Sequence, residues 1–130
     1  MVARHRVRLK RIYEESAEND GYRVLVDRIW PRGMSRDRAR IDEWLKEVGP
    51  SATLRTWYGH EPDRFEEFAR RYRSELTNGA PAVALTHLRA IVRDCGPAGV
   101  TLLTSTKRSD ISQAAVLVQL LSEPETVGDA

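Results

Sequence analysis

Alternating polar and apolar residues identify the first strands of this chain. Apolar and basic side chains alternate over residues 7–13, which is the period of a half-buried strand near a sheet edge. Residues 22–30 are rich in β-branched and aromatic residues, and Val24 and Leu25 place apolar side chains on both faces. Residues 99–104 form a third short apolar run. A strand covered on both faces is typical of the centre of an α/β sheet, so residues 22–30 are predicted to be central.

The link between the first two predicted strands is short and polar. Residues 14–21 end in the turn sequence Asn-Asp-Gly. A parallel crossover normally needs a dozen or more residues, whereas a hairpin can be closed by a short turn. On local pattern alone, the strands at 7–13 and 22–30 are therefore predicted to form an antiparallel hairpin.

Helical periodicity dominates the middle and the end of the chain. The apolar residues between 41 and 48 recur at i, i+3, i+4 and i+7, which predicts an amphipathic helix that Ser35 caps and Gly49-Pro50 ends. The other predicted helical segments are a short turn at 51–57, a helix from Pro62 closed by Asn78-Gly79, a helix from Pro81 to Gly96, and a last helix over 110–121.

Composition limits the class of protein. A chain of 130 residues predicts one domain, over residues 1–121, followed by a flexible tail at 122–130. No apolar run is long enough to span a membrane, and the basic N-terminus leads into no signal-peptide core. The single cysteine, Cys95, excludes an internal disulfide and favours a reducing cytoplasm. One cysteine and three histidines are an unfavourable set of ligands for a structural zinc site, so no metal is predicted. No motif identifies a cofactor.

Positive charge is concentrated in the first third of the chain. The net charge is +2, but residues 1–40 carry eleven Lys and Arg against six Asp and Glu. Such a region can attract phosphate or nucleic acid. One hypothesis is therefore a nucleic-acid-binding or regulatory module that uses Arg4 to Arg11 and Arg36 to Arg40. The alternative is an ordinary solvated basic face.

The segment DRIWPRG, residues 27–33, carries two arginines, a carboxylate and an indole where a predicted strand ends at Pro31. If this strand and residues 99–104 are parallel, their carboxyl ends meet at one edge, where α/β sheets bind ligands. That edge would hold the anion-binding groups Arg28, Arg32, Lys107 and the hydroxyls of Thr104, Ser105 and Thr106. In a purely structural alternative, Asp27 pairs with Arg28 or Arg32 to fix the turn, and Trp30 fills the core.

His60 is the histidine best placed for chemistry. It follows the aromatic residues Trp57 and Tyr58 in a loop before a predicted helix. A histidine side chain can act as an acid, a base or a ligand contact. It can equally cap the helix that follows. Asp27 and His60 are the candidate catalytic residues, and Trp57, like Trp30, is a candidate stacking surface.

The string DGYRVLVDRIWPRG at residues 20–33 is long and specific. Further matches are Asp42 to Lys46, Leu54-Arg55, Trp57 to His60, Arg64 to Phe68 with Arg71-Tyr72, and Val100 to Leu103 with Lys107 and Ala114. In these residues the chain resembles domain-of-unknown-function family 488, in its short YeaO-like branch. The resemblance implies a Rossmann-like three-layer α/β domain whose small, mostly parallel sheet is flanked by helices. It also implies that the first two strands are parallel, which overrides the hairpin expectation.

The same resemblance implies a signature cleft but no established activity. The implied cleft residues are Asp27, Arg28, Trp30, Pro31, Arg32, Gly33, Gly59, His60 and Lys107. Similar proteins usually have an acidic residue after the lysine and a His-Asn pair three residues beyond it, where this chain has Arg108, Ile111 and Ser112. If the family's chemistry needs that histidine, this chain only binds. If Arg28, Arg32 and His60 are the working groups, nothing essential is missing.

The leading prediction is a cytoplasmic α/β protein that binds a small phosphate-bearing or nucleotide-like anion. Arg28 and Arg32 would clamp the anion, with Trp30, Gly33, Trp57, Thr104 and Lys107 completing the ligand site. Nucleic acid is the alternative partner, and a third possibility is a protein that associates through its aromatic cluster. The sequence leaves open whether the cleft is catalytic and which oligomeric state the protein adopts.

Overall fold

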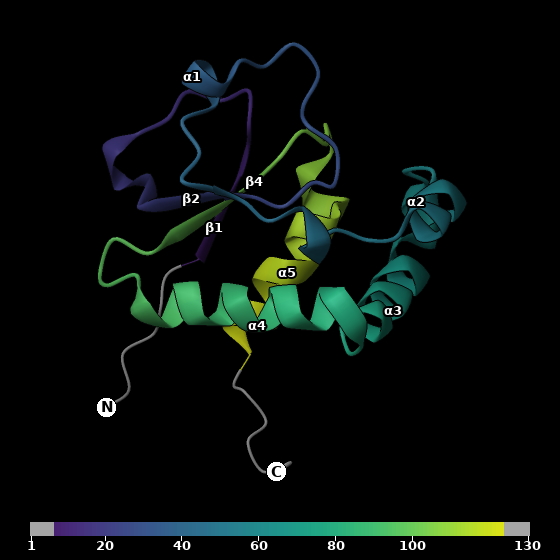
Figure 1. The fold of residues 1–130 in the computed structure, drawn as a ribbon. Helices are drawn as coiled ribbons and strands as arrows, with labels where there is room; N and C mark the ends of the chain where they lie inside the picture. The colour runs from purple at the N-terminus through teal and green to yellow at the C-terminus, as the bar shows by residue number, and fades with distance from the viewer. Residues whose placement is uncertain (1–6, 124–130) are drawn as a thin grey trace.

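A four-stranded parallel sheet forms the centre of the protein, in a computed structural model that describes residues 7–123 (Figure 1). The strands lie in the order β1-β4-β2-β3, and each neighbouring pair is parallel. Their bounds are β1 Val7–Arg11, β2 Tyr22–Leu25, β3 Glu43–Trp44 and β4 Val100–Thr104. The helices are α1 Arg36–Ala39, α2 Ala52–Tyr58, α3 Phe65–Glu75, α4 Gly79–Asp94 and α5 Gln113–Ser122. The predicted α/β class, with a small parallel sheet flanked by helices, is confirmed.

The two faces of the sheet are covered unequally. Figure 1 shows α4 and α5 on one side of the sheet and α1 on the other. Val24 and Leu102 are fully buried in the larger core, beneath the longer helices, whereas their neighbours Leu25 and Leu103 are fully buried in a smaller core with Met34. Adjacent residues of a strand point to opposite faces, so apolar residues in succession match a strand buried on both sides. The predicted central position of the second strand is confirmed.

The hairpin expectation for the first two strands is wrong, and the parallel arrangement implied by the resemblance is confirmed. β4 lies between β1 and β2 and is parallel to both. The link over residues 12–21 contains a turn at residues 12–13 and a short 3-10 helix, Glu18–Asp20, and it does not pair β1 with β2. The backbone carbonyl of Asp20 accepts a 2.6 Å hydrogen bond from the Thr101 hydroxyl of β4. This hydrogen bond ties the polar link between β1 and β2 to β4, the strand that lies between them.

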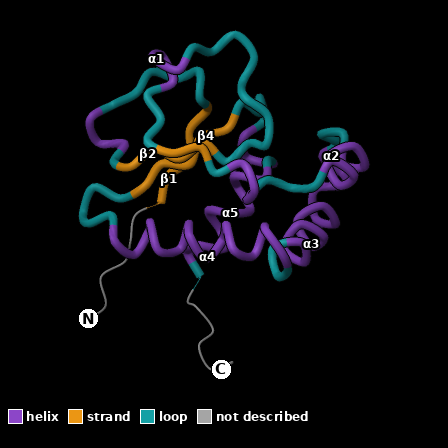
Figure 2. Tube along the Cα trace, in the orientation of Figure 1, coloured by secondary structure: helices purple, strands orange, loops and turns teal. Residues whose placement is uncertain are grey.

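The predicted amphipathic helix through residues 41–48 is also wrong. Ser35 does cap a helix, since its hydroxyl accepts a hydrogen bond from the Arg38 amide, but α1 stops at Ala39. Arg40 has a left-handed backbone with φ 48°, which ends the helix, and the chain then pairs with β2 as the edge strand β3. The apolar stripe is divided between the two cores: Ile41 and Trp44 pack in the smaller one, and Leu45 and Val48 lie in the larger one. Figure 2 shows how much of the segment from β2 to α2 is loop.

The remaining predicted elements are present with shifted ends. α2, α3 and α4 follow the predicted pattern, and the last helix, α5, begins only at Gln113 because Ser112 caps it. α5 extends to Ser122, one residue into the predicted tail, and residues 124–130 lie outside the described part of the chain. The division into one domain over 1–121 and a tail stays a prediction. None of the helices described is long and apolar enough to cross a membrane.

Candidate functional site

A cavity of about 470 Å³ opens where β2 and β4 end. Four parts of the chain line it: residues 27–32 after β2, Pro50 with residues of α2 and the following His60, Phe68 of α3, and residues between β4 and the start of α5. The carboxyl ends of parallel strands meet at one edge of a sheet, which is where open α/β folds bind ligands. The predicted convergence of the segment after β2 with the segment after β4 is confirmed.

Asp27 ties the walls of this cavity together. One of its carboxylate oxygens accepts hydrogen bonds from the Thr104 hydroxyl at 2.7 Å and the Gln113 amide at 2.6 Å. The other accepts from the amide and the hydroxyl of Ser105, each at 2.8 Å. The side chain is only 8% exposed. Asp27 therefore joins β2, β4 and α5, and within residues 7–123 the ion pairs with Arg28 or Arg32 that the structural alternative required are not formed.

Arg28 is held by its Nε and carries free terminal nitrogens. Its Nε donates to the carbonyl oxygens of Gly49 at 3.0 Å and Pro50 at 2.8 Å. A Cβ added at Gly49 would lie 2.8 Å from the Cγ of Arg28, so the arginine stem packs directly on that glycine. No partner within residues 7–123 takes a hydrogen bond from the two Nη atoms. The side chain is thus positioned through its Nε, and its terminal donors remain available to a ligand.

Arg55, on α2, is a lining residue that sequence reasoning missed. Its Nε is fully buried yet has no hydrogen-bond partner among the described residues. Tyr58, one helical turn further on, also lines the cavity and donates a 2.7 Å hydrogen bond to the carbonyl oxygen of Ile111. Burial raises the pKa of the Tyr58 hydroxyl, which keeps it a hydrogen-bond donor. The signal in the sequence was the three-residue spacing of Arg55 and Tyr58, which places both on one helix face.

His60 reaches the cavity on an unusual stretch of backbone. Gly59 and His60 both have positive φ, at 53° and 58°, and this conformation is uncommon for any residue other than glycine. The imidazole is exposed, with its centroid 6.0 Å from that of the Tyr58 ring. The alternative role of helix cap is not adopted, because Glu61 occupies the N-cap position of the next 3-10 helix. His60 is therefore presented to the cavity by a left-handed turn at the end of α2.

The two tryptophans predicted as stacking surfaces already have partners. Trp30 lines the cavity, but its Nε1 donates to the Met34 carbonyl at 2.7 Å and the Arg36 guanidinium lies 4.8 Å from its ring. Trp57 lies outside the cavity lining, with Arg64 and Arg71 stacked against its ring at 5.3 and 4.2 Å. Trp57 was predicted as a ligand contact because it adjoins His60 in sequence, but the helix turns it toward α3 instead.

Three other predicted contacts stand back from the cavity. Gly33 forms a turn with φ 75°, Thr104 is fully buried against Asp27, and Lys107 is exposed beyond the lining residues. The neighbours of Thr104, Ser105 and Thr106, line the cavity in its place. The structure thus brings together Asp27, Arg28, Trp30, Arg32 and His60, and adds Arg55, Thr56, Ser112 and Gln113.

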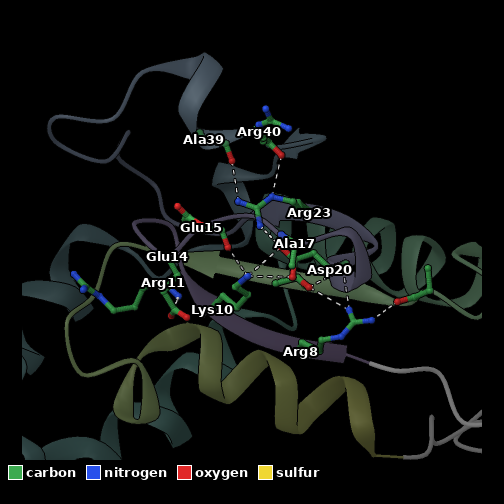
Figure 3. A network of polar contacts seen from close by, with 12 residues as sticks. Arg8, Lys10, Arg11, Glu14, Glu15, Ala17, Asp20, Arg23, Ala39 and Arg40 are labelled. Carbon is green, nitrogen blue, oxygen red and sulfur yellow. Dashed lines mark hydrogen bonds and ion pairs between the residues drawn. The ribbon is translucent and has the colours of Figure 1, made fainter.

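Arg8 and Lys10 of β1, with Arg23 of β2, form a polar network around Asp20 at the start of β2, which Figure 3 shows. Arg11, at the end of β1, instead donates to the carbonyls of Ser105 and Thr106 beside the cavity. Arg8 donates to the backbone of Asp20 at 2.8 Å, and Lys10 reaches the Asp20 carboxylate at 3.1 Å. Arg23, only 5% exposed, donates to that carboxylate and, at 2.9 Å each, to the carbonyls of Ala39 and Arg40. These cations face the protein, not a partner surface, and Arg4 and Arg6 of the predicted nucleic-acid surface lie outside the described residues.

Burial and hydrogen bonding act against each other on Asp20. Burial alone would raise the pKa of its carboxyl, but hydrogen bonds from the Ala17 amide, Lys10 and Arg23 hold that pKa below its ordinary value. Asp20 is 3% exposed. The carboxylate is therefore charged in the folded protein and neutralised by two cations.

Comparison with known proteins gives one family and no described activity. The profile of a family described as "Inactive DUF488-N3 subclade" matches residues 6–129. Uncharacterised protein Rv3073c of Mycobacterium tuberculosis is 49% identical over 122 residues, which cover 94% of this chain and 98% of the relative; Mb3100c of Mycobacterium bovis matches to the same extent. Uncharacterised protein YeaO of Escherichia coli is 41% identical over 70 residues, 54% of this chain and 61% of YeaO. No solved structure matches the chain.

Proposed function

The chain belongs to domain-of-unknown-function family 488, and we propose that it binds a small phosphate-bearing or nucleotide-like anion at the strand-end cavity without converting it. The observation that carries this proposal is the imbalance of charge in the lining. Three guanidinium groups, those of Arg28, Arg32 and Arg55, line one cavity with His60. The carboxylate of Asp27 is the acidic group in that lining, and its oxygens already accept four hydrogen bonds.

Two further features favour an oxyanion over other ligands. Guanidinium groups match the geometry of phosphate oxygens and remain charged at all relevant pH values. Ser112 and Gln113, at the amino end of the ten-residue helix α5, also line the cavity. The oriented amide groups at a helix amino end favour negative charge. A ligand that carries phosphate would therefore meet cationic and dipolar groups from three directions.

Binding without turnover agrees both with the description of the family and with the residues that form the site. The matching subclade is described as inactive. Ile111 and Ser112 occupy the positions where similar proteins have a His-Asn pair, and Ser112 lies in the cavity wall. The carboxylate of Asp27, predicted to be catalytic, accepts four hydrogen bonds from Thr104, Ser105 and Gln113 and thereby holds the cavity walls together. On this proposal His60 contacts the ligand, and the cytoplasm remains the predicted compartment.

The proposal is tested by calorimetric titration with inorganic phosphate, sugar phosphates and nucleoside monophosphates. Arg32 is exposed and its guanidinium makes no hydrogen bond within residues 7–123, so Arg32→Ala is expected to fold normally. Its affinity for the best ligand is expected to fall about tenfold, the usual effect of losing one charged hydrogen bond. Arg93→Ala, which removes an exposed arginine of α4 outside the cavity, is the matched control. Absence of any binding, or equal affinity in Arg32→Ala, would contradict the proposal.

Nucleic acid is the weaker alternative. The basic residues of β1 that were predicted to bind it, Arg8, Lys10 and Arg11, use their side-chain donors on groups of the protein itself. The same titration series distinguishes the alternatives when it includes a short oligonucleotide at several salt concentrations. Steep loss of oligonucleotide binding with salt, in the absence of small-anion binding, would favour nucleic acid.

A further inference from the structure

Arg55 has a buried donor that the protein leaves unpaired. Its Nε is inaccessible to solvent. Within the described part of the chain, it is the one buried side-chain nitrogen or oxygen that lacks a hydrogen-bond partner. Buried polar atoms are nearly always hydrogen-bonded, because an unpaired one loses its interaction with water and gains nothing in return. The protein covers this Nε, but the guanidinium belongs to a residue that lines the cavity and makes no side-chain hydrogen bond within residues 7–123, as expected of a group whose acceptor arrives with a ligand.

The helix that carries Arg55 is fixed at both ends, so this orientation is built into the fold. At the start of α2, the amide and the hydroxyl of Ser51 donate to Glu75, at 2.9 and 2.5 Å. The Ser51 hydroxyl also accepts from the Leu54 amide and caps the helix. At its end, the buried Tyr58 hydroxyl is bonded to the loop before α5. Two anchors on a seven-residue helix leave little freedom for it to turn Arg55 away from the cavity.

The other two arginines of the cavity present different atoms. Arg28 uses its Nε on the carbonyls of Gly49 and Pro50, so only its terminal nitrogens can reach a ligand. Arg32 is exposed at the rim. Arg55 is thus the lining arginine whose Nε is buried and still without an acceptor among residues 7–123. The two terminal nitrogens of Arg55 also have no acceptor within residues 7–123, and together they can donate end-on to two oxygens of one group, which a lysine cannot do.

Resting on the proposed function, we propose that Arg55 recognises the terminal phosphate of a phosphate monoester, with its two terminal nitrogens donating to two oxygens of that group. The charge of the lining supports the choice of a monoester. Three guanidinium groups against one carboxylate leave two positive charges in excess. A monoester carries about −1.5 to −2 at neutral pH, whereas a diester carries a single negative charge and has fewer terminal oxygens. The monoester therefore matches the excess charge, whereas the paired donors of a guanidinium could contact two oxygens of either group.

The test uses lysine substitutions, which keep the positive charge of an arginine but remove the paired N–H donors of its guanidinium group. Phenyl phosphate and dimethyl phosphate serve as monoester and diester probes in calorimetric titrations of the full chain. Arg55→Lys is expected to weaken phenyl phosphate binding about tenfold or more, because one bidentate contact becomes a point charge. Arg32→Lys, at the exposed rim, is expected to change it by less than about threefold. Arg93→Lys is the control and should bind as the wild type does.

Thermal unfolding of a second variant distinguishes recognition from a structural role. Arg55→Met keeps the length of the side chain and removes the unpaired donor. If the donor exists for a ligand, this variant is expected to melt at or above the wild-type temperature while losing phenyl phosphate binding. A structural arginine would instead lower the melting temperature. If Arg55→Lys folds poorly, the melting temperature and phenyl phosphate binding of Arg55→Met still test the proposal.

The outcomes separate this inference from the function on which it rests. Failure of the wild type to bind phenyl phosphate, other phosphates and inorganic phosphate would overturn both. Wild-type binding that Arg55→Lys retains in full, or equal affinity for dimethyl phosphate, would overturn the role of Arg55 alone. Strong destabilisation by Arg55→Met with binding unchanged in the folded fraction would do the same.

Discussion

Two clusters of basic side chains lie at opposite ends of β2, and they differ in what their donors bind. At the start of the strand, Arg8, Lys10 and Arg23 surround the buried Asp20, and the guanidinium of Arg23 uses all three of its nitrogens on acceptors of the protein. At its end, Asp27 is bonded to Thr104, Ser105 and Gln113, so the neighbouring arginines are left without a carboxylate.

The difference shows why the count of basic residues is a poor guide to binding. Residues 1–40 have the largest excess of positive charge and contribute to both clusters: Arg8, Lys10 and Arg23 bond to Asp20 and to backbone carbonyls, whereas Arg28 and Arg32 line the cavity. In the cavity, the terminal nitrogens of Arg28 and the guanidinium groups of Arg32 and Arg55 make no hydrogen bond within residues 7–123. Availability of donors, more than local charge, distinguishes a binding site from a structural network.

The largest effect is expected from breaking the network at Asp20. Asp20→Asn keeps the shape of the side chain and leaves Arg23 and Lys10 without a counter-charge in a buried site. Removing one partner of a buried ion pair typically costs about 3–5 kcal/mol. Chemical denaturation should show a loss of this size in the free energy of unfolding. Asp63→Asn, at an exposed position, is the control, and a loss of under about 0.5 kcal/mol for Asp20→Asn would contradict the assignment.

The same carboxylate predicts how stability depends on acid. The pKa of Asp20 is lower in the folded protein than in the unfolded chain, so the folded state binds a proton less readily. Its contribution is therefore complete above the unfolded pKa of about 4 and is lost as the pH falls through the lower folded value. Unfolding curves of wild type and Asp20→Asn should converge as the pH falls below about 4. A constant difference throughout would contradict this prediction.

A smaller effect is expected from displacing Arg28 without changing it. Gly49 has an ordinary φ of −72°, so alanine fits its backbone, but the added Cβ would collide with the Cγ of Arg28. Overpacking of this kind costs about 1–3 kcal/mol. Gly49→Ala should therefore lower both the free energy of unfolding and the affinity for phosphate. Gly96→Ala would be a poor control because the φ of Gly96 is positive. Ala80→Gly, at an exposed position of α4, instead measures a glycine–alanine exchange away from the cavity. Unchanged affinity in Gly49→Ala would show that Arg28 does not contact the ligand.

The smallest effect should have the opposite sign for stability. His60 holds a left-handed backbone, which costs a non-glycine residue about 1–2 kcal/mol, and glycine recovers part of this while adding entropy to the unfolded chain. His60→Gly should raise the free energy of unfolding by about 1 kcal/mol or less and weaken phosphate binding. Stability that rises with no change in affinity would remove His60 from the site.

Much of the fold was predictable because strand patterns are local. The buried run ending at Thr104 was predicted at its observed end, whereas the strand predicted over residues 22–30 ends at Leu25, so residues 27–30 belong to the segment after it. Parallel pairing brings the ends of β2 and β4 together. The segment 41–48 was not predictable, since its apolar spacing suits a helix and only the pairing of Trp44 with β2 makes it a strand. Arg55 was missed because its importance lies in an unpaired atom. Trp57 was assigned wrongly to the lining, because Arg64 and Arg71 hold its ring elsewhere.

The central claim is that the cations at the end of β2, and not those at its start, bind phosphate. The most direct test is a titration of the isotope-labelled chain with phenyl phosphate, followed by backbone and arginine Nε–H resonances. The account predicts saturable shifts at residues 27–32, 55–60 and 105–113, with the Arg55 Nε–H among the largest, and none at Arg8 or Arg23. Shifts centred on Arg8 and Arg23, or no saturable shift at any residue, would contradict it.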